Sequence, residues 1–157
     1  MNYHDRAIAD IFVAKSLMSP SGNPTNDEGI RDIAAYHVQQ GIEKEMKHIL
    51  HDIKGVDDTT RSFKTHVIED LIDQVEDNGV SVPDYVKEIA YDLSSWEATS
   101  RYSESSIAVS QDINDAITVY ERFAEFVKGL DEEAGEETGE EVEEAEDTDH
   151  AESETEE

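Results

Sequence analysis

Two short segments of the chain place an arginine close to a histidine, two residue types that can bind phosphate and transfer a proton. A guanidinium binds phosphate through its planar fork, and an imidazole exchanges protons near neutral pH. Four residues separate Arg61 from His66, and five separate Arg31 from His37. Arg61 is the better candidate because it lies in a polar loop beside a predicted helix start, where backbone N–H groups favour phosphate and Lys64 adds charge.

His48 and His51 are another pair of nearby side chains that suggests a site. They are three residues apart and have acidic neighbours, which is compatible with metal binding. Exposed histidines on a terminal helical turn are far commoner than metal ligands, so we expect no metal and no cofactor. The sequence also lacks a glycine-rich phosphate loop and a basic stripe for nucleic acid.

The element that must organise these residues is a long helix from Ile30 to Ile53, ending near Gly55. Apolar or small residues recur along it at steps of three and four, which places them in one stripe: Ile30, Ala34, Val38, Gly41, Ile42, Met46, Ile49 and Ile53. The other side is polar, and Glu43 and Lys47 form a favourable pair one turn apart. The pattern predicts the central helix of a bundle.

Four further helices are predicted around the central one. The first covers about residues 2–18, the third about 65–76, the fourth begins near Pro83, and the fifth covers about 112–129. Thr25 and Glu28 have the spacing of a capping box before the central helix. No segment alternates like a strand, so we expect an all-α, up-and-down bundle of about five helices.

Charge divides the chain into a body, residues 1–130, and a tail, residues 131–157. The formal net charge is -28, and the tail holds 16 acidic residues and no lysine or arginine. One valine and no aromatic residue leave the tail little to bury, which predicts a disordered acidic segment. The body keeps 24 acidic and 12 basic residues, a balance that opposes non-specific binding to phosphate backbones and attracts basic partners.

The cellular compartment is indicated only by features that the sequence lacks. There is no cysteine, the N-terminus lacks the layout of a signal peptide, and no apolar run approaches the ~18 residues of a membrane span. We therefore expect a soluble, cytoplasmic protein with no membrane association.

Three segments, in order, resemble HEPN domains. The run from Ala34 to Leu50 (AAYHVQQGIEKEMKHIL) is similar to the second helix of the family. Lys64–Ile72 resembles the family's Thr-His-Asp-Leu segment, and Ser100–Ser103 its small-Arg-Tyr-Pro segment. Val67 replaces the usual Asp, which weakens any chemistry that depends on that Asp, and Ser103 replaces the usual Pro.

The resemblance implies a nucleotide- or RNA-associated binding module or a toxin-type module. Such domains are typically homodimers and are often paired with a minimal nucleotidyltransferase. It also implies an alternative, a metal-independent ribonuclease in which Arg61 and His66 act across a dimer. His66 has a structural interpretation too, in which it docks one helix against another. A helical adaptor with an acidic interaction tail is a third possibility.

Two further groups of residues suggest binding, one to a nucleotide and one to a second copy of the chain. Arg101 and Tyr102 match a family segment near a cleft, where Arg would bind phosphate and Tyr would stack on a base. The alternative is that Arg101 pairs with a nearby acid and Tyr102 fills the end of the bundle. Three apolar residues lie outside the apolar stripes of the central and fifth helices, which predicts an exposed surface for self-association. They are Tyr36, Phe123 and Phe126.

Overall fold

Every regular element that the structure describes is helical, which confirms the all-α prediction. The computed structural model describes the backbone of residues 1–19, 27–102 and 108–147, and the side chains of 1–19, 27–98 and 108–137. None of the helices within these ranges is both long enough and apolar enough to cross a membrane.

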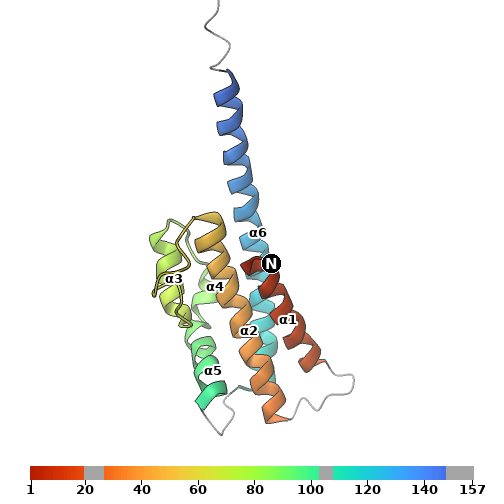
Figure 1. Ribbon diagram of the computed structural model, residues 1–157. Helices are drawn as coiled ribbons and strands as arrows, with labels where there is room; N and C mark the ends of the chain where they lie inside the picture. The colour runs from red at the N-terminus through yellow and green to blue at the C-terminus, as the bar shows by residue number, and fades with distance from the viewer. Residues whose placement is uncertain (20–26, 103–107, 148–157) are drawn as a thin grey trace, which may run out of the picture.

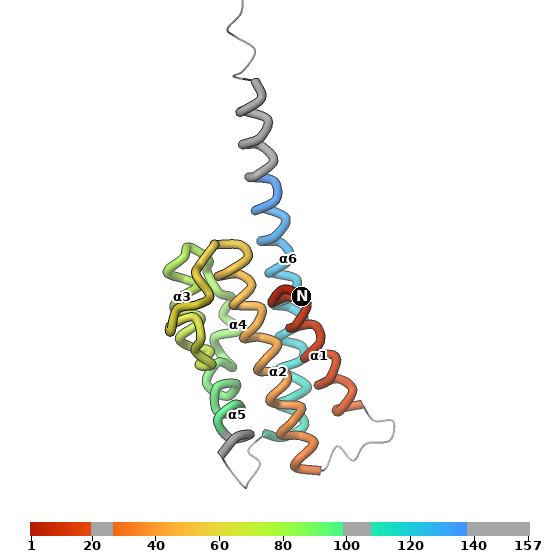
Figure 2. The backbone as a smooth tube through the Cα atoms, viewed as in Figure 1, coloured from red at the N-terminus to blue at the C-terminus, as the bar shows by residue number. Residues whose placement is uncertain are grey.

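Four long helices form the bundle (Figures 1 and 2). Helices α1 (Tyr3–Met18) and α5 (Ala90–Tyr102) run opposite to α2 (Glu28–His48) and α6 (Ser110–Asp147), as an up-and-down bundle requires. Between α2 and α5, the chain forms one π-helical turn and two shorter helices, which are η1 (Ile49–Ile53), α3 (Ile68–Asp77) and α4 (Asp84–Lys87).

Helix α2 is the centre of the fold, as predicted. It packs against α1, α3, α5 and α6, and its apolar stripe from Ala34 to Met46 is buried. Because neighbours cover it on several sides, much of its polar side is buried as well: Gln39, Gln40, Glu43, Glu45, Lys47 and His48. Buried polar groups require hydrogen-bond partners, so this helix is also the origin of the polar networks described below.

The helix starts differ in detail from the predictions. Asp27 caps α2, with its carboxylate accepting from the backbone N–H of Ile30 at 3.1 Å. The predicted cap, Thr25, lies outside the described residues. A capping box does occur, but at the start of α1, between Asn2 and Asp5. Aspartate at an N-cap satisfies a backbone donor that otherwise has no partner within the helix.

The other boundaries differ for local reasons. Helix α3 begins at Ile68 rather than near Thr65, and the predicted fourth helix is divided into the single turn α4 and the longer α5. Helix α6 does not end near Gly129 but continues to Asp147, through a proline-free segment rich in glutamate, which propagates a helix well. It therefore extends past the other helices (Figure 1), and residues 148–157 lie outside the described part.

The predicted self-association surface is wrong for Phe123, which is fully buried, while Tyr36 and Phe126 are partly buried. In the described residues, the large apolar side chains with the greatest exposure on a long helix are elsewhere, and they include Phe12 on α1 and Tyr91 on α5.

Candidate functional site

The loop that carries Arg61 connects η1 to α3 and is held by one aromatic anchor. Phe63 is buried, and its ring meets the rings of Tyr3 and His51 edge-on, at centroid distances of 5.6 and 6.2 Å. The Lys47 ammonium lies 5.6 Å from the Phe63 centroid, within the range of a cation–π contact. The anchor fixes the loop, and with it the neighbours of Phe63.

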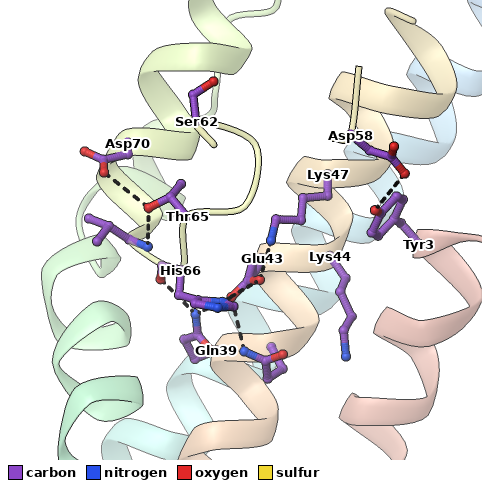
Figure 3. Close-up of polar contacts among 12 residues, drawn as sticks. Tyr3, Gln39, Glu43, Lys44, Lys47, Asp58, Ser62, Thr65, His66 and Asp70 are labelled. Carbon is purple, nitrogen blue, oxygen red and sulfur yellow. Dashed lines mark hydrogen bonds and ion pairs between the residues drawn. The ribbon is translucent and has the colours of Figure 1, made fainter. Parts of the chain in front are cut away.

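An open pocket of about 710 Å³ lies beside this loop and the first turns of α3. Two cations, Arg61 and Lys64, line it together with two hydroxyl residues, two carboxylates and an amide: Ser62, Thr65, Asp70, Asp73 and Gln74. The Thr65 hydroxyl donates to Asp70 at 3.3 Å, and the Gln74 amide donates to the Ser62 carbonyl at 3.0 Å (Figure 3 shows Ser62, Thr65 and Asp70). The pocket therefore combines donors for phosphate with acceptors for hydroxyl groups.

His66 is held by a carboxylate from α2. Its Nδ1 lies 3.1 and 3.2 Å from the two oxygens of Glu43, whose side chain is 3% exposed, while the His66 side chain is 45% exposed (Figure 3). A carboxylate only accepts hydrogen bonds, so Nδ1 carries the proton and Nε2 is the nitrogen that can take one up. The contact also docks the start of α3 against α2, as the structural interpretation expected.

Glu43 is the hub of a buried network on α2. Its oxygens accept from Lys47 Nζ at 2.7 Å, from Gln39 Nε2 at 2.9 Å and from Gln40 Nε2 at 3.1 Å. Gln39 Nε2 also reaches the His66 carbonyl at 3.2 Å, which joins the two helices a second time. The Glu43–Lys47 pair is the one expected from the sequence, but it is buried rather than solvated.

The start of α3 departs from ordinary capping. Val67 occupies the N-cap position and provides no side-chain hydrogen bond. Hydroxyls of two other residues accept from the backbone N–H groups there instead. Ser94 of α5 accepts from the Ile68 N–H at 3.0 Å, and Thr65 accepts from the Val67 N–H at 3.2 Å. Ser94 also donates to Glu69 at 2.6 Å. Val67, which stands where the family usually has Asp, therefore provides no cap, and Thr65 and Ser94 supply the acceptors for this helix start.

The structure does not bring all the predicted residues to one place. Arg61 and Lys64 line the pocket, but His66 is absent from the described residues that line it and faces Glu43 instead. In the second arginine–histidine pair, Arg31 and His37, the His37 Nδ1 lies 2.7 Å from an Asp10 oxygen, so this histidine joins α1 to α2. The side chains of Arg101 and Tyr102, at the end of α5, lie outside the described residues.

In the part of the chain with described side chains, no group of three potential ligands is placed to hold a metal ion. His51 lies 3.0 Å from the Val56 carbonyl. His48 lies between two carboxylates, Asp52 and Asp131. The second of these contacts was not predicted, because 83 residues separate His48 from Asp131.

Comparison with known proteins identifies the fold. A family model described as the HEPN domain matches residues 24–130, a range that includes α2, the Arg61 loop, α3, α5 and the part of α6 that packs in the bundle. Searches of curated proteins and of solved structures found no match. The match covers more than half of the 157 residues and includes all three segments that suggested the resemblance, so the chain belongs to the HEPN domain family.

Proposed function

We propose that this protein is a nucleotide- or RNA-associated HEPN module that binds the phosphate-bearing end of a ribonucleotide. The observation that carries the proposal is the pocket beside α3. Arg61 and Lys64 supply charge-assisted donors for a phosphate, and Asp70 and Asp73 supply acceptors for ribose hydroxyls.

The charge of the molecule favours a small phosphate ligand over an extended one. Residues 1–130 hold twice as many acidic as basic side chains, which opposes tracking of a long phosphate backbone. A site with two cations predicts a shallow salt dependence, with a slope of about −1.4 in a plot of log affinity against log salt for a single strand. The same acidic surface attracts a basic protein, and a minimal nucleotidyltransferase is the partner that we propose for a toxin-type pair.

Binding is tested by fluorescence anisotropy with a labelled single-stranded RNA that carries a terminal phosphate, followed by competition with ADP. Arg61→Gln combined with Lys64→Gln removes both cations and should weaken binding by about tenfold or more, since each charge-assisted hydrogen bond contributes about 1.5–3 kcal/mol. Lys54→Gln combined with Lys128→Gln removes two exposed lysines that do not line the pocket, and it is the control with a matched charge change. Equal loss in both variants would attribute binding to net charge and contradict the pocket.

A second candidate function, metal-independent RNA cleavage, is favoured by the contact between His66 and Glu43. The buried carboxylate fixes the imidazole with Nε2 as its basic nitrogen, which is the arrangement of a general base. In this proposal Nε2 removes the proton from a ribose 2′-hydroxyl while Arg61 of the partner protomer stabilises charge on the phosphate. The single chain does not place Arg61 and His66 in one pocket, so cleavage requires the dimer.

Cleavage is tested by incubating the RNA with the wild type and with His66→Ala, Arg61→Ala and, as the control, Arg31→Ala. Loss of the general base should lower the rate by about 10²- to 10⁴-fold. Activity should persist in EDTA and in Arg31→Ala. Equal cleavage by the wild type and His66→Ala would contradict the role of His66, and binding without cleavage would leave the binding module as the function.

A further inference from the structure

A second polar cluster lies at the C-terminal end of α2, where α1 and α6 pack against it, and His48 is at its centre. The His48 side chain is only 7% exposed. Its Nδ1 lies 2.7 Å from an Asp52 oxygen on η1, and its Nε2 lies 3.0 Å from both oxygens of Asp131 on α6. Both ring nitrogens therefore face carboxylates, and these belong to two different elements.

The protonation state of His48 follows from this geometry. Ionised carboxylates only accept hydrogen bonds, and a neutral imidazole has a single N–H to donate. Only the imidazolium form can donate to Asp52 and Asp131 together, whereas the neutral form would direct a lone pair at one of them. Burial opposes the charge, but the hydrogen bonds to Asp131 and Asp52 outweigh it and raise the pKa of His48.

The groups around His48 come from each element packed against it. The His4 ring of α1 lies 5.5 Å away, and its Nδ1 is 3.0 Å from both oxygens of the fully buried Glu45. The Tyr120 hydroxyl of α6 donates to Glu45 at 2.9 Å, and burial beside that carboxylate raises the pKa of Tyr120. Lys128 of α6 lines the same pocket as His4 and Asp131. A charge on His4 would oppose one on His48, and Glu45 offsets that repulsion.

We propose that His48 is a proton-operated clamp, which in its charged form fastens α6 at Asp131 to α2 and η1. Asp131 is the first residue of the acidic segment that continues α6 beyond the bundle, so the clamp holds this segment at its base. When His48 loses its proton, its single remaining N–H can donate to only one of the two carboxylates, and the charge attraction to Asp131 is lost, so α6 is held less strongly at that point. The orientation of the acidic segment thereby becomes dependent on pH.

The sign of the effect follows from the raised pKa. Stability from the clamp is fully present below the pKa of His48 in the unfolded chain, about 6.5, and is lost as the pH rises through the higher value in the folded protein. Lower pH also relieves general repulsion in so acidic a chain, and only a site-specific variant separates the two effects.

The test is NMR titration of the imidazole nitrogens in the full-length protein, between about pH 5.5 and 8.5. Asp131→Asn removes the charge that faces Nε2, and Glu132→Gln removes a charge from the adjacent exposed residue. The His48 pKa should exceed about 6.5 in the wild type and in Glu132→Gln, and should fall in Asp131→Asn. Equal His48 pKa values in the two variants, or a neutral His48 in the wild type near pH 6, would overturn the clamp.

Thermal unfolding provides the second measurement. The gain in Tm between about pH 8.5 and 6 should be smaller in Asp131→Asn and His48→Gln than in Glu132→Gln. If His48→Gln does not fold, Asp131→Asn alone decides the outcome. The same gain in all variants would mean that only general charge repulsion responds to pH, which would contradict the clamp.

Discussion

Glu43 holds Lys47 and His66 in place, and its charge is the reason. Glu43→Gln leaves the nearly buried Lys47 ammonium without a counter-charge, and removing one partner from a buried pair typically lowers the free energy of unfolding by about 3–5 kcal/mol. Urea unfolding measures the loss. Glu121→Gln is the control, because its pair with Lys15 is half exposed and should contribute about 0–1 kcal/mol. A loss in Glu43→Gln no larger than the ~0–1 kcal/mol expected for the control would mean that the Glu43 network adds little stability.

Gly41 marks a close approach of α1 to α2. A Cβ at this position would lie 2.9 Å from both Cδ1 and Cγ1 of the buried Ile11. Gly41→Ala should therefore reduce the free energy of unfolding by about 1–3 kcal/mol. Gly129→Ala, on α6 with open space around it, should instead raise it by about 0.5–1 kcal/mol through better helix propensity. A stabilised Gly41→Ala would show that the two helices can move apart without loss.

At the scale of single residues, the sequence predicts contacts within a helix better than contacts between helices. The Glu43–Lys47 pair follows from their spacing, one turn apart. The contact between His66 and Glu43 spans 23 residues, and that between His4 and Glu45 spans 41. No local pattern indicates such pairs, because they depend on which helices cover the polar side of α2.

At the scale of elements, α3 has a start that can be improved. Val67 is exposed and occupies the N-cap position without providing a hydrogen bond. Val67→Asp adds an acceptor there and should raise the free energy of unfolding by about 1 kcal/mol, as measured in urea. Val67→Ala removes the same side chain without adding an acceptor and should not stabilise. Equal effects of the two substitutions would show that Ser94 already satisfies the helix start.

The positions of the long helices could be predicted because each has an apolar stripe, while their ends could not. Helix α3 starts later than predicted, and its first N–H is satisfied by Ser94 from another helix. Helix α6 continues beyond Val127, the last buried residue among its described side chains, because glutamate and alanine propagate a helix without packing. Apolar periodicity reports which residues are buried and carries no information about helix that extends past the core.

At the scale of the whole molecule, self-association is the property that RNA cleavage requires. Ile8 and Phe12, one turn apart on α1, are 51% and 72% exposed, and exposed apolar residues on one face often mark an interface. We expect the protein to be a homodimer through this face, which replaces the surface predicted from Tyr36, Phe123 and Phe126. Light scattering at micromolar concentration should then report about twice the monomer mass of 17.6 kDa.

Phe12→Glu places a charge in the centre of that face and should convert the dimer to a monomer, because a charge without a partner is costly to bury in an interface. Tyr91→Glu, at a position on α5 that is 75% exposed, is the matched control and should remain dimeric. Far-ultraviolet circular dichroism confirms that both variants keep their helices. A monomeric wild type would exclude cleavage across a dimer but not phosphate binding by Arg61 and Lys64. A dimer in Phe12→Glu and a monomer in Tyr91→Glu would assign the interface to α5 instead.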